Sequence, residues 1–394
     1  MALTPKREGV WNRAFLLINI VLFTASAGLA IFFDFQQYLE SLHIPKHWIG
    51  LLISADGLAG LVVQIIITPL LHASNARKGM IAGICILCLA LFSYRWAVDT
   101  AAILVVRLLH GCGFVVLASS LMAALVHVIP PGRSGLAFGI ISTTRLLPYA
   151  FVPPLLGLVA RGADDFGSMV LAAGVGIMGL LPLIALLHPK ADSGVTVQRE
   201  ARQPLRMIIR NAGELRVMLL LIVTLLLSSG FAVVFFYIKQ YAVTLGADNA
   251  GLFFGIATAL MIASRLMGSS SMDRIDKRRT AMAALTVLVA AFLLLALGQK
   301  GSLFLVSAVL AGLGWGIAIP LVSALIFDIS DPMFRGTNIN FSMVMGQAGF
   351  FVGPMLGGVA LAVSGYAAIF AVCGVATLTG ILLLMLLKPD RSAA

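Results

Sequence analysis

The chain has 394 residues, of which 60% are apolar and only 11% are charged, and its net charge is +11. A soluble domain carries about 25% charged residues, so this composition excludes soluble enzymes and soluble binding modules and predicts a polytopic membrane protein. The positive charge is compatible with nucleic-acid binding or with a basic cytoplasmic face, and the positions of the charges decide between the two.

Apolar windows separated by charged or Gly/Pro-containing turns predict twelve transmembrane helices. Most windows hold the ~20 predominantly apolar residues that a helix needs to cross the hydrocarbon core. In chain order, the predicted helices cover 13–37, 47–71, 79–97, 100–128, 134–160, 167–188, 214–240, 248–271, 279–298, 302–327, 335–363 and 366–387.

One long polar stretch divides the twelve predicted helices into two sets of six. It predicts an N-terminal six-helix bundle over 1–189, a cytoplasmic linker over 190–213 and a C-terminal six-helix bundle over 214–394. Of the 27 Lys and Arg residues, nineteen fall in segments on the side of the N-terminus and four in the loops of the opposite side. The positive-inside rule then places both termini in the cytoplasm, and the basic charge needs no nucleic-acid partner.

The two halves repeat each other at an offset close to 200 residues. Gly111 in the fourth predicted helix corresponds to Gly312 in the tenth, and a Pro-x-x-Gly at Pro154 corresponds to one at Pro354. Two parallel repeats predict a pseudo-two-fold axis along the membrane normal, with a substrate cavity between the halves. Rocking of the halves about a central site would expose that site to alternate sides, so the repeat predicts a carrier.

Three motifs resemble those of the major facilitator superfamily. The segment 268–279 resembles the loop signature G-x-x-x-D-R-x-G-R-R, with Asp273 and Arg274 at its Asp-Arg pair. The segment 107–113 resembles R-x-x-Q-G-x-G, with His110 in place of Gln, and 349–358 matches G-x-x-x-G-P-x-x-G-G in full. The resemblance covers essentially the whole chain and includes the twelve-helix drug:proton antiporter, or efflux-permease, branch.

The resemblance implies roles for several of these residues. It implies that Arg107 takes part in proton coupling and that Asp273 and Arg274 bridge the halves as part of a gate. Gly353 and Pro354 are expected to allow bending of the eleventh helix during gating, with simple tight packing as the alternative. Arg265 resembles a common arginine of the eighth helix that anchors the following loop, which favours a structural or gating role.

Charged residues inside the bilayer are the strongest functional candidates, because burying a charge there is costly. A rise of about 1.5 Å per residue places Asp56, His110 and Arg145 at one level near the midplane, with Arg107 slightly outward. Asp34 lies toward the outer end of the first helix, within reach of Arg107 by this reckoning. We therefore expect the mechanism to depend on these residues.

Asp56 is predicted to be the proton site, with Asp34 as the second candidate. A carboxylate that loses water binds a proton more readily, and an approaching cation reverses this effect. The alternative for Asp56 is a permanent ion pair with Arg107 or Arg145 that only holds helices together. His110 is predicted either to titrate near neutral pH or to act as a hydrogen-bonding spacer.

Arg145 is predicted to bind a carboxylate or phosphate group of the substrate, with pairing to Asp56 as the alternative. Further cavity residues are expected among the polar and aromatic side chains of the second half, although helix packing is an equal or better explanation for each. These candidates are Tyr237, Trp315, Asn340 and Gln347.

The predicted function is secondary active transport by alternating access: proton-coupled export of a small organic molecule in a cell inner membrane. The alternative is proton-coupled uptake of an organic anion or another metabolite. An enzyme is excluded by motif, because the sequence holds no G-x-x-x-x-G-K-[ST] loop, no G-x-S-x-G elbow and no His spacing that suits a metal. The expected partners are a small-molecule substrate, protons and the lipid bilayer; we expect a monomer without cofactors.

Overall fold

Every regular element in the described part of the chain is a helix. The computed structural model describes residues 11–67, 70–71, 73–125, 128, 134–159, 165–186, 205–246, 250–268, 275–298, 301–331 and 333–387. Helices suit a bilayer because each one satisfies its own backbone hydrogen bonds. The elements are α1 (Arg13–Ala30), the 3₁₀ helix η1 (Ile31–Asp34), α2 (Phe35–Ser41), α3 (Lys46–Ile67), α4 (Ala73–Ser93), α5 (Thr100–Leu125), α6 (Ser134–Val159), α7 (Asp165–Met178), α8 (Leu181–Ala185), α9 (Leu205–Ala212), α10 (Leu215–Thr244), α11 (Ala250–Gly268), α12 (Lys277–Ala296), α13 (Ser302–Ile329) and α14 (Arg335–Leu386).

Ten helical segments in the described residues are long and apolar enough to cross a membrane. One of them, α14, has 52 residues and contains two helices that meet at Gly365, whose φ of 79° favours glycine. This break lies between the predicted helices 335–363 and 366–387. The helix α6 is 26 residues long and contains three prolines. The fold class is therefore confirmed as an all-helical membrane protein, while the count of twelve spans stays a prediction.

The predicted first span over 13–37 is confirmed as one helical segment over Arg13–Ser41, although its turns tighten between Ile31 and Asp34. Asn12 caps the start of α1 by accepting a hydrogen bond from the backbone N–H of Phe15 at 2.9 Å. The α-helix ends at Ala30, and the tighter turns of η1 carry the chain to Asp34 before α2 begins. Apolar periodicity does not report such a change, because the residues on both sides are equally apolar.

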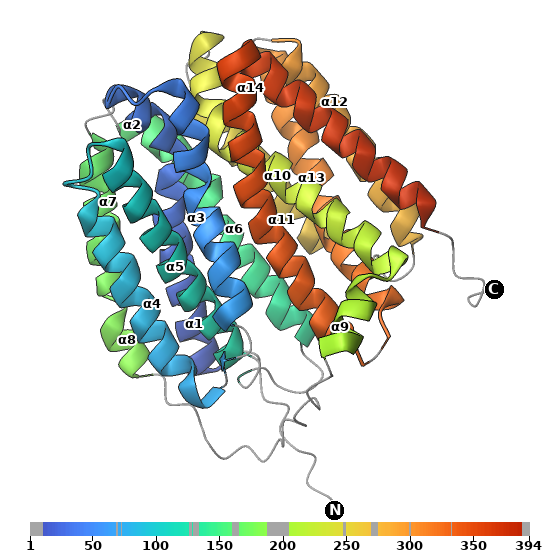
Figure 1. Cartoon of the computed structure of the whole chain (residues 1–394), viewed down its shortest axis with the longest axis horizontal. Helices are drawn as coiled ribbons and strands as arrows, with labels where there is room; N and C mark the ends of the chain where they lie inside the picture. Colours follow the sequence, from blue (N-terminus) through green and yellow to red (C-terminus); the bar gives the residue numbers. More distant parts are fainter. Residues whose placement is uncertain are drawn as a thin grey trace, which may run out of the picture.

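The helices form two groups that lie side by side in Figure 1. In the first group α1 packs on α6 and α7, and α5 packs on α3 and α4; in the second α10 packs on α14, and α13 packs on α11 and α12. We call the top of Figure 1, which carries α2, the α2 end, and the bottom, which carries α9, the α9 end. The Gly365 break lies at the α2 end, because Tyr366 beside it accepts a hydrogen bond from Gln36 of α2. Residues 187–204 lie outside the described part, so the predicted domain limits at 189 and 213 stay predictions.

Two helix pairs join the groups, and we call them the α3–α14 seam and the α6–α11 seam. At Gly50 on α3, an added Cβ would lie 2.8 Å from the Cα of Gly358 on α14. At Gly251 on α11, an added Cβ would lie 2.3 Å from the backbone oxygen of Pro153 on α6. Both seams therefore depend on the absence of a side chain at their closest points.

The short helix α9 is attached to the second group by buried amides. Asn211 of α9 donates a 2.6 Å hydrogen bond to the side-chain oxygen of Asn338 on α14, and the amide of Asn338 donates to Ser330 at 2.7 Å. All three side chains are at most 8% exposed. Because a buried amide without partners is costly, this network fixes α9 against the start of α14.

Candidate functional site

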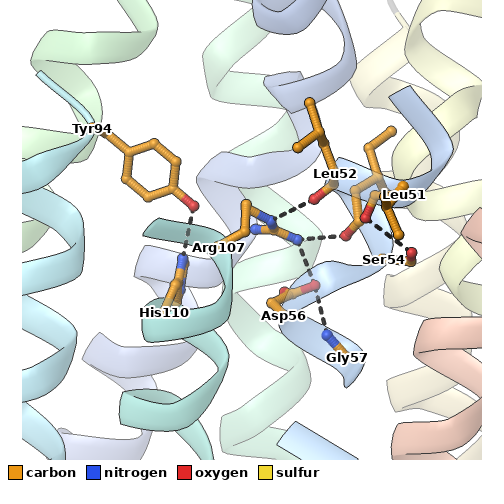
Figure 2. Close-up of polar contacts among 9 residues, drawn as sticks. Leu51, Leu52, Ser54, Asp56, Gly57, Tyr94, Arg107 and His110 are labelled. Atoms are coloured by element: carbon orange, nitrogen blue, oxygen red, sulfur yellow. Dashed lines mark hydrogen bonds and ion pairs between the residues drawn. The ribbon is translucent and has the colours of Figure 1, made fainter. Parts of the chain in front are cut away.

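A buried ion pair between α3 and α5 is the centre of the first group. Nη2 of Arg107 lies 2.5 Å from Oδ1 of Asp56, and the arginine side chain is fully buried. The guanidinium also donates hydrogen bonds to the backbone oxygens of Leu52 at 3.0 Å and Ile53 at 2.6 Å. Figure 2 shows this arrangement, in which Arg107 reaches across from α5 to the backbone of α3. The cation thus has one charged and two neutral acceptors.

Close contact between α3 and α5 makes this geometry possible. An added Cβ at Gly111, one turn along α5 from Arg107, would lie 2.2 Å from the backbone oxygen of Asp56. On α3, the backbone N–H of Gly57 donates to Oδ1 of Asp56 at 2.8 Å and so orients the carboxylate. The two glycines of the site therefore allow the backbones to approach and hold the acid in position.

Aromatic rings surround the Arg107 guanidinium. Its central carbon lies 4.6 Å from the ring centroid of Phe35 and 5.1 Å from that of Phe32, within cation–π range. The Asp56 side chain is different, because 19% of it is exposed. A small ion can therefore reach the carboxylate of Asp56, whereas the side chain of Arg107 is inaccessible.

His110 lies one turn from Arg107 and faces away from Asp56. Its Nδ1 is 3.4 Å from the hydroxyl of Tyr94, and its ring packs on Phe32 with centroids 4.6 Å apart. The side chain is only 2% exposed. The structure thus brings Asp56, Arg107 and His110 into one region, and it places His110 in a setting that suits the hydrogen-bonding spacer.

Asp34 has a partner that the sequence reasoning did not find. Its Oδ2 lies 2.7 Å from Nζ of Lys239 on α10, so the pair joins η1 of the first group to the second group. The expected approach of Asp34 to Arg107 is not seen. A second contact lies at the α2 end, where the amide of Gln36 donates a 2.6 Å hydrogen bond to the hydroxyl of Tyr366 on α14. Both contacts hold the two groups together at the α2 end.

An aromatic cluster between the groups was also missed. Phe33 packs on Phe235 and Phe254 of the second group, with centroids 5.9 and 5.7 Å apart, and Tyr149 of α6 packs on the same two rings at 5.3 and 6.2 Å. We call Phe33, Tyr149, Phe235 and Phe254 the aromatic cluster. Phenylalanines in apolar spans carry no distinguishing signal in one sequence, so only their spatial arrangement reveals the cluster.

The two remaining intramembrane arginines lie at the α6–α11 seam. Nη1 of Arg265 on α11 donates to the hydroxyl of Ser142 on α6 at 2.5 Å, which gives this arginine a contact across the groups. Arg145 lies one turn further along α6 and is exposed. The expected alternative of an Arg145–Asp56 pair is not present, because Asp56 pairs with Arg107.

The other predicted cavity residues divide between buried and accessible positions. Tyr237 is fully buried and donates a 2.7 Å hydrogen bond to the backbone oxygen of Pro354. Trp315 is also fully buried and packs on Phe231, so in this state both side chains serve packing. Asn340 is exposed.

The predicted gating residues and Gln347 lie at or near the packed helices. Gln347 lies on the α3–α14 seam, where an added Cβ at Gly60 would be 3.4 Å from its side-chain oxygen. Gly353 packs against the backbone of Ser229 on α10. Asp273 and Arg274 lie outside the described residues, so their gating role stays a prediction.

A family model described as Major Facilitator Superfamily matches residues 15–301 and 271–394, which together cover nearly the whole chain. The chain belongs to the major facilitator superfamily. This membership confirms the resemblance inferred from the motifs, and it identifies the protein as a multi-pass membrane protein of a transporter family and not as an enzyme.

Two relatives match only part of this chain. The quinolone resistance protein NorA of Staphylococcus aureus is 29% identical over 122 residues, which is 31% of each chain. The multidrug resistance protein MdtH of Aeromonas hydrophila is 30% identical over 111 residues, which is 28% of each chain. The matches thus span less than a third of these relatives.

Among solved structures, that of a D-xylose–proton symporter superimposes with a TM-score of 0.77. The alignment covers 96% of this chain and 98% of the symporter at 13% identity. At this identity the likeness establishes the superfamily fold alone.

Proposed function

We propose that this superfamily transporter exports a small organic molecule in exchange for protons, with both termini in the cytoplasm of a cell with an inner membrane. The observation that carries the proposal is the Asp56–Arg107 ion pair, which is buried in the first group and accessible only at its acid. Partial similarity to NorA and MdtH, whose names describe drug resistance, supports the export direction.

Asp56 is the proposed proton carrier because its pair with Arg107 can open without isolating the arginine. Protonation of Asp56 removes the negative charge that faces the guanidinium. The backbone oxygens of Leu52 and Ile53 and the ring of Phe35 still stabilise the cation. A buried cation with such a second set of partners tolerates repeated loss and return of its counter-ion, which a proton-coupled cycle requires.

The ion pair is also well placed to affect the α3–α14 seam. Gly57, which follows Asp56 and donates to its carboxylate, packs against the backbone of Phe350 on α14, where an added Cβ would lie 2.8 Å away. A change in the charge of Asp56 therefore acts on the backbone that contacts the second group. Such a link between a proton site and a moving interface is what alternating access needs.

In the proposed topology the α9 end faces the cytoplasm. The contacts Asp34–Lys239 and Gln36–Tyr366 close the α2 end, while Arg145 and Asn340 remain exposed. A carrier in this state would take up its substrate from the cytoplasm, which is the loading step of an exporter.

Proton-coupled uptake of an organic anion or another metabolite is the second candidate. The observation in its favour is the excess of cations among the intramembrane charges: Asp34 and Asp56 each pair with a basic residue, and Arg145 and Arg265 remain. This excess of cations favours an anionic substrate, but it does not distinguish uptake from export.

Transport in energised membrane vesicles separates the two directions. In inverted vesicles with an acidic interior, export predicts accumulation of substrate as protons leave; co-movement of substrate and protons in right-side-out vesicles would instead establish uptake. A panel of drug-like and metabolite-like compounds serves as the probe.

The matched variants in this assay are Asp56→Asn and Asp328→Asn. Asp328 also forms a 2.7 Å ion pair, with Lys277, but at the periphery of the second group. We expect Asp56→Asn to abolish proton-driven transport while the purified protein stays folded, and Asp328→Asn to retain transport. Normal proton-driven transport by Asp56→Asn would remove this residue from the mechanism.

A further inference from the structure

Arg145 shares a helix face with two residues that contact the second group. Ser142, three residues earlier on α6, accepts the hydrogen bond from Arg265, and Tyr149, four residues later, packs on Phe235 and Phe254. Positions three and four apart in a helix are neighbours on its surface. The Arg145 side chain therefore projects toward the interface between the groups and not toward the lipid.

At this interface Arg145 is exposed, whereas Ser142 and Tyr149 on either side of it are partly buried. An exposed side chain on a face that otherwise packs against another helix indicates open space at that level. Arg265 reaches the same face of α6 through its hydrogen bond to Ser142, one turn from Arg145. Two guanidinium groups thus border the same space.

No described acid compensates these two arginines. Asp56 pairs with Arg107, and Asp34 pairs with Lys239 at the α2 end. The bond from Arg265 goes to a neutral hydroxyl, and its Nε is buried without a partner in the described structure. Like charges at this depth are unfavourable unless an anion joins them.

We propose that Arg145 and Arg265 form a binding site for the carboxylate or phosphate group of an organic anion. The planar donor fork of arginine matches both groups, and two forks bracket one anion. The aromatic cluster adjoins the site through Tyr149, so the apolar body of the ligand packs on this ring. The ligand is therefore an aryl or alkyl anion and not an inorganic one.

This site deepens the proposed function by naming the substrate class, and it rests on that proposal only for the presence of a small organic substrate. Binding needs no proton gradient and has the same geometry for export and uptake. Failure of proton coupling through Asp56 would leave the site intact, and failure of anion binding would leave the coupling mechanism intact.

Calorimetric titration of the full-length protein in detergent tests the site. The probes are naphthalene-2-carboxylate, 2-naphthyl phosphate, the neutral naphthalene-2-carboxamide and inorganic phosphate. The two naphthyl anions distinguish a carboxylate from a phosphate ligand, because they share one apolar body. We expect at least one of them to bind about tenfold or more tightly than the carboxamide, as hydrogen bonds to charged groups imply.

Variants locate the binding. Arg145→Gln and Arg265→Gln each remove one charge while keeping a hydrogen-bond donor, and we expect either change to reduce the preference for the anion to about twofold or less. Arg145→Lys keeps the charge and retains part of the preference. Arg95→Gln, at an exposed position between α4 and α5, removes the same charge elsewhere and leaves the preference unchanged. Elution as a single species on size-exclusion chromatography shows that each variant is folded.

Three results would overturn the proposal. The first is equal affinity of the naphthyl anions and the carboxamide, or binding of none of them. The second is an unchanged preference in Arg145→Gln. The third is inorganic phosphate binding as tightly as the naphthyl anions, which would mean that the aromatic cluster contributes nothing.

Discussion

Replacing Asp34 with Asn removes the acid of the ion pair that joins η1 to α10 at the α2 end. The pair is 2.7 Å long, and its side chains are only 9% and 19% exposed. At an effective dielectric constant of about 20, two unit charges at this distance attract by about 6 kcal/mol. Desolvation of both groups offsets much of this, and a net contribution of about 1–3 kcal/mol remains.

Because the two partners belong to different groups, this free energy favours the state that is closed at the α2 end. Its loss shifts the equilibrium between closed and open states by about 5- to 150-fold. The lone Lys239 charge adds to the shift, since an unpaired cation gains hydration when the groups separate. We therefore expect Asp34→Asn to populate a state that is open at the α2 end.

Double electron–electron resonance spectroscopy measures this opening as the distance between two spin labels. Ser41 on α2 and Ser364 beside the Gly365 break are exposed at the α2 end, one in each group, and accept labels after Ser→Cys substitution. The four native cysteines are free and are replaced first. We expect a single short-distance population in the parent protein and a growing longer-distance population in Asp34→Asn.

Two controls define the result. Asp328→Asn breaks an ion pair of equal length within the second group, so it should leave the distances unchanged. The exchange Asp34→Lys with Lys239→Asp restores the attraction and should restore the short distance. An unchanged distance distribution in Asp34→Asn would refute the reasoning.

Three further variants test packing through the thermal unfolding of the purified protein. Arg107→Ala removes a fully buried side chain and leaves Asp56 without its ionic partner, so it should cost about 3–5 kcal/mol, and unfolding at the parent temperature would contradict the site as described. Gly111→Ala places a Cβ 2.2 Å from a backbone oxygen and should cost about 1–3 kcal/mol, whereas Gly139→Ala, with no atom within 4 Å, is the matched control and should be neutral. Asn338→Ala leaves the amide of Asn211 buried without its acceptor and should cost about 1–3 kcal/mol; full stability would show that this network is dispensable.

The sequence was sufficient for the fold class, while the depth of the intramembrane charges stays a prediction. Lengths of apolar runs predict spans, and a fixed rise per residue places Asp56, His110 and Arg145 at one level, with Arg107 slightly outward. The structure brings Asp56 and Arg107 into direct contact. The depth of a residue does not show which way its side chain points around the helix axis. The sequence therefore did not distinguish Arg107 from Arg145 as the partner of Asp56, and the structure identifies Arg107.

The partner of Asp34 illustrates what a single sequence does not report. Its side chain contacts Lys239 from the last residue of η1, and no residue pattern marks the change from α-helix to 3₁₀ helix there. The aromatic cluster was missed for a related reason, since apolar composition does not distinguish rings that meet across two groups from rings that pack within one. Contacts between elements distant in the chain need three-dimensional information.

The glycine contacts at the two seams have a kinetic consequence. At Gly50 the nearest neighbours are the Cα of Gly358 and the backbone oxygen of Pro354, and at Gly251 they belong to the backbone of Pro153 and Pro154. Interlocked side chains must leave one set of pockets and rearrange their rotamers when surfaces move apart. Contacts between backbones need no such rearrangement, so the two groups can move relative to each other with a low barrier. A methyl group added at either glycine would therefore slow that motion as well as weaken the contact.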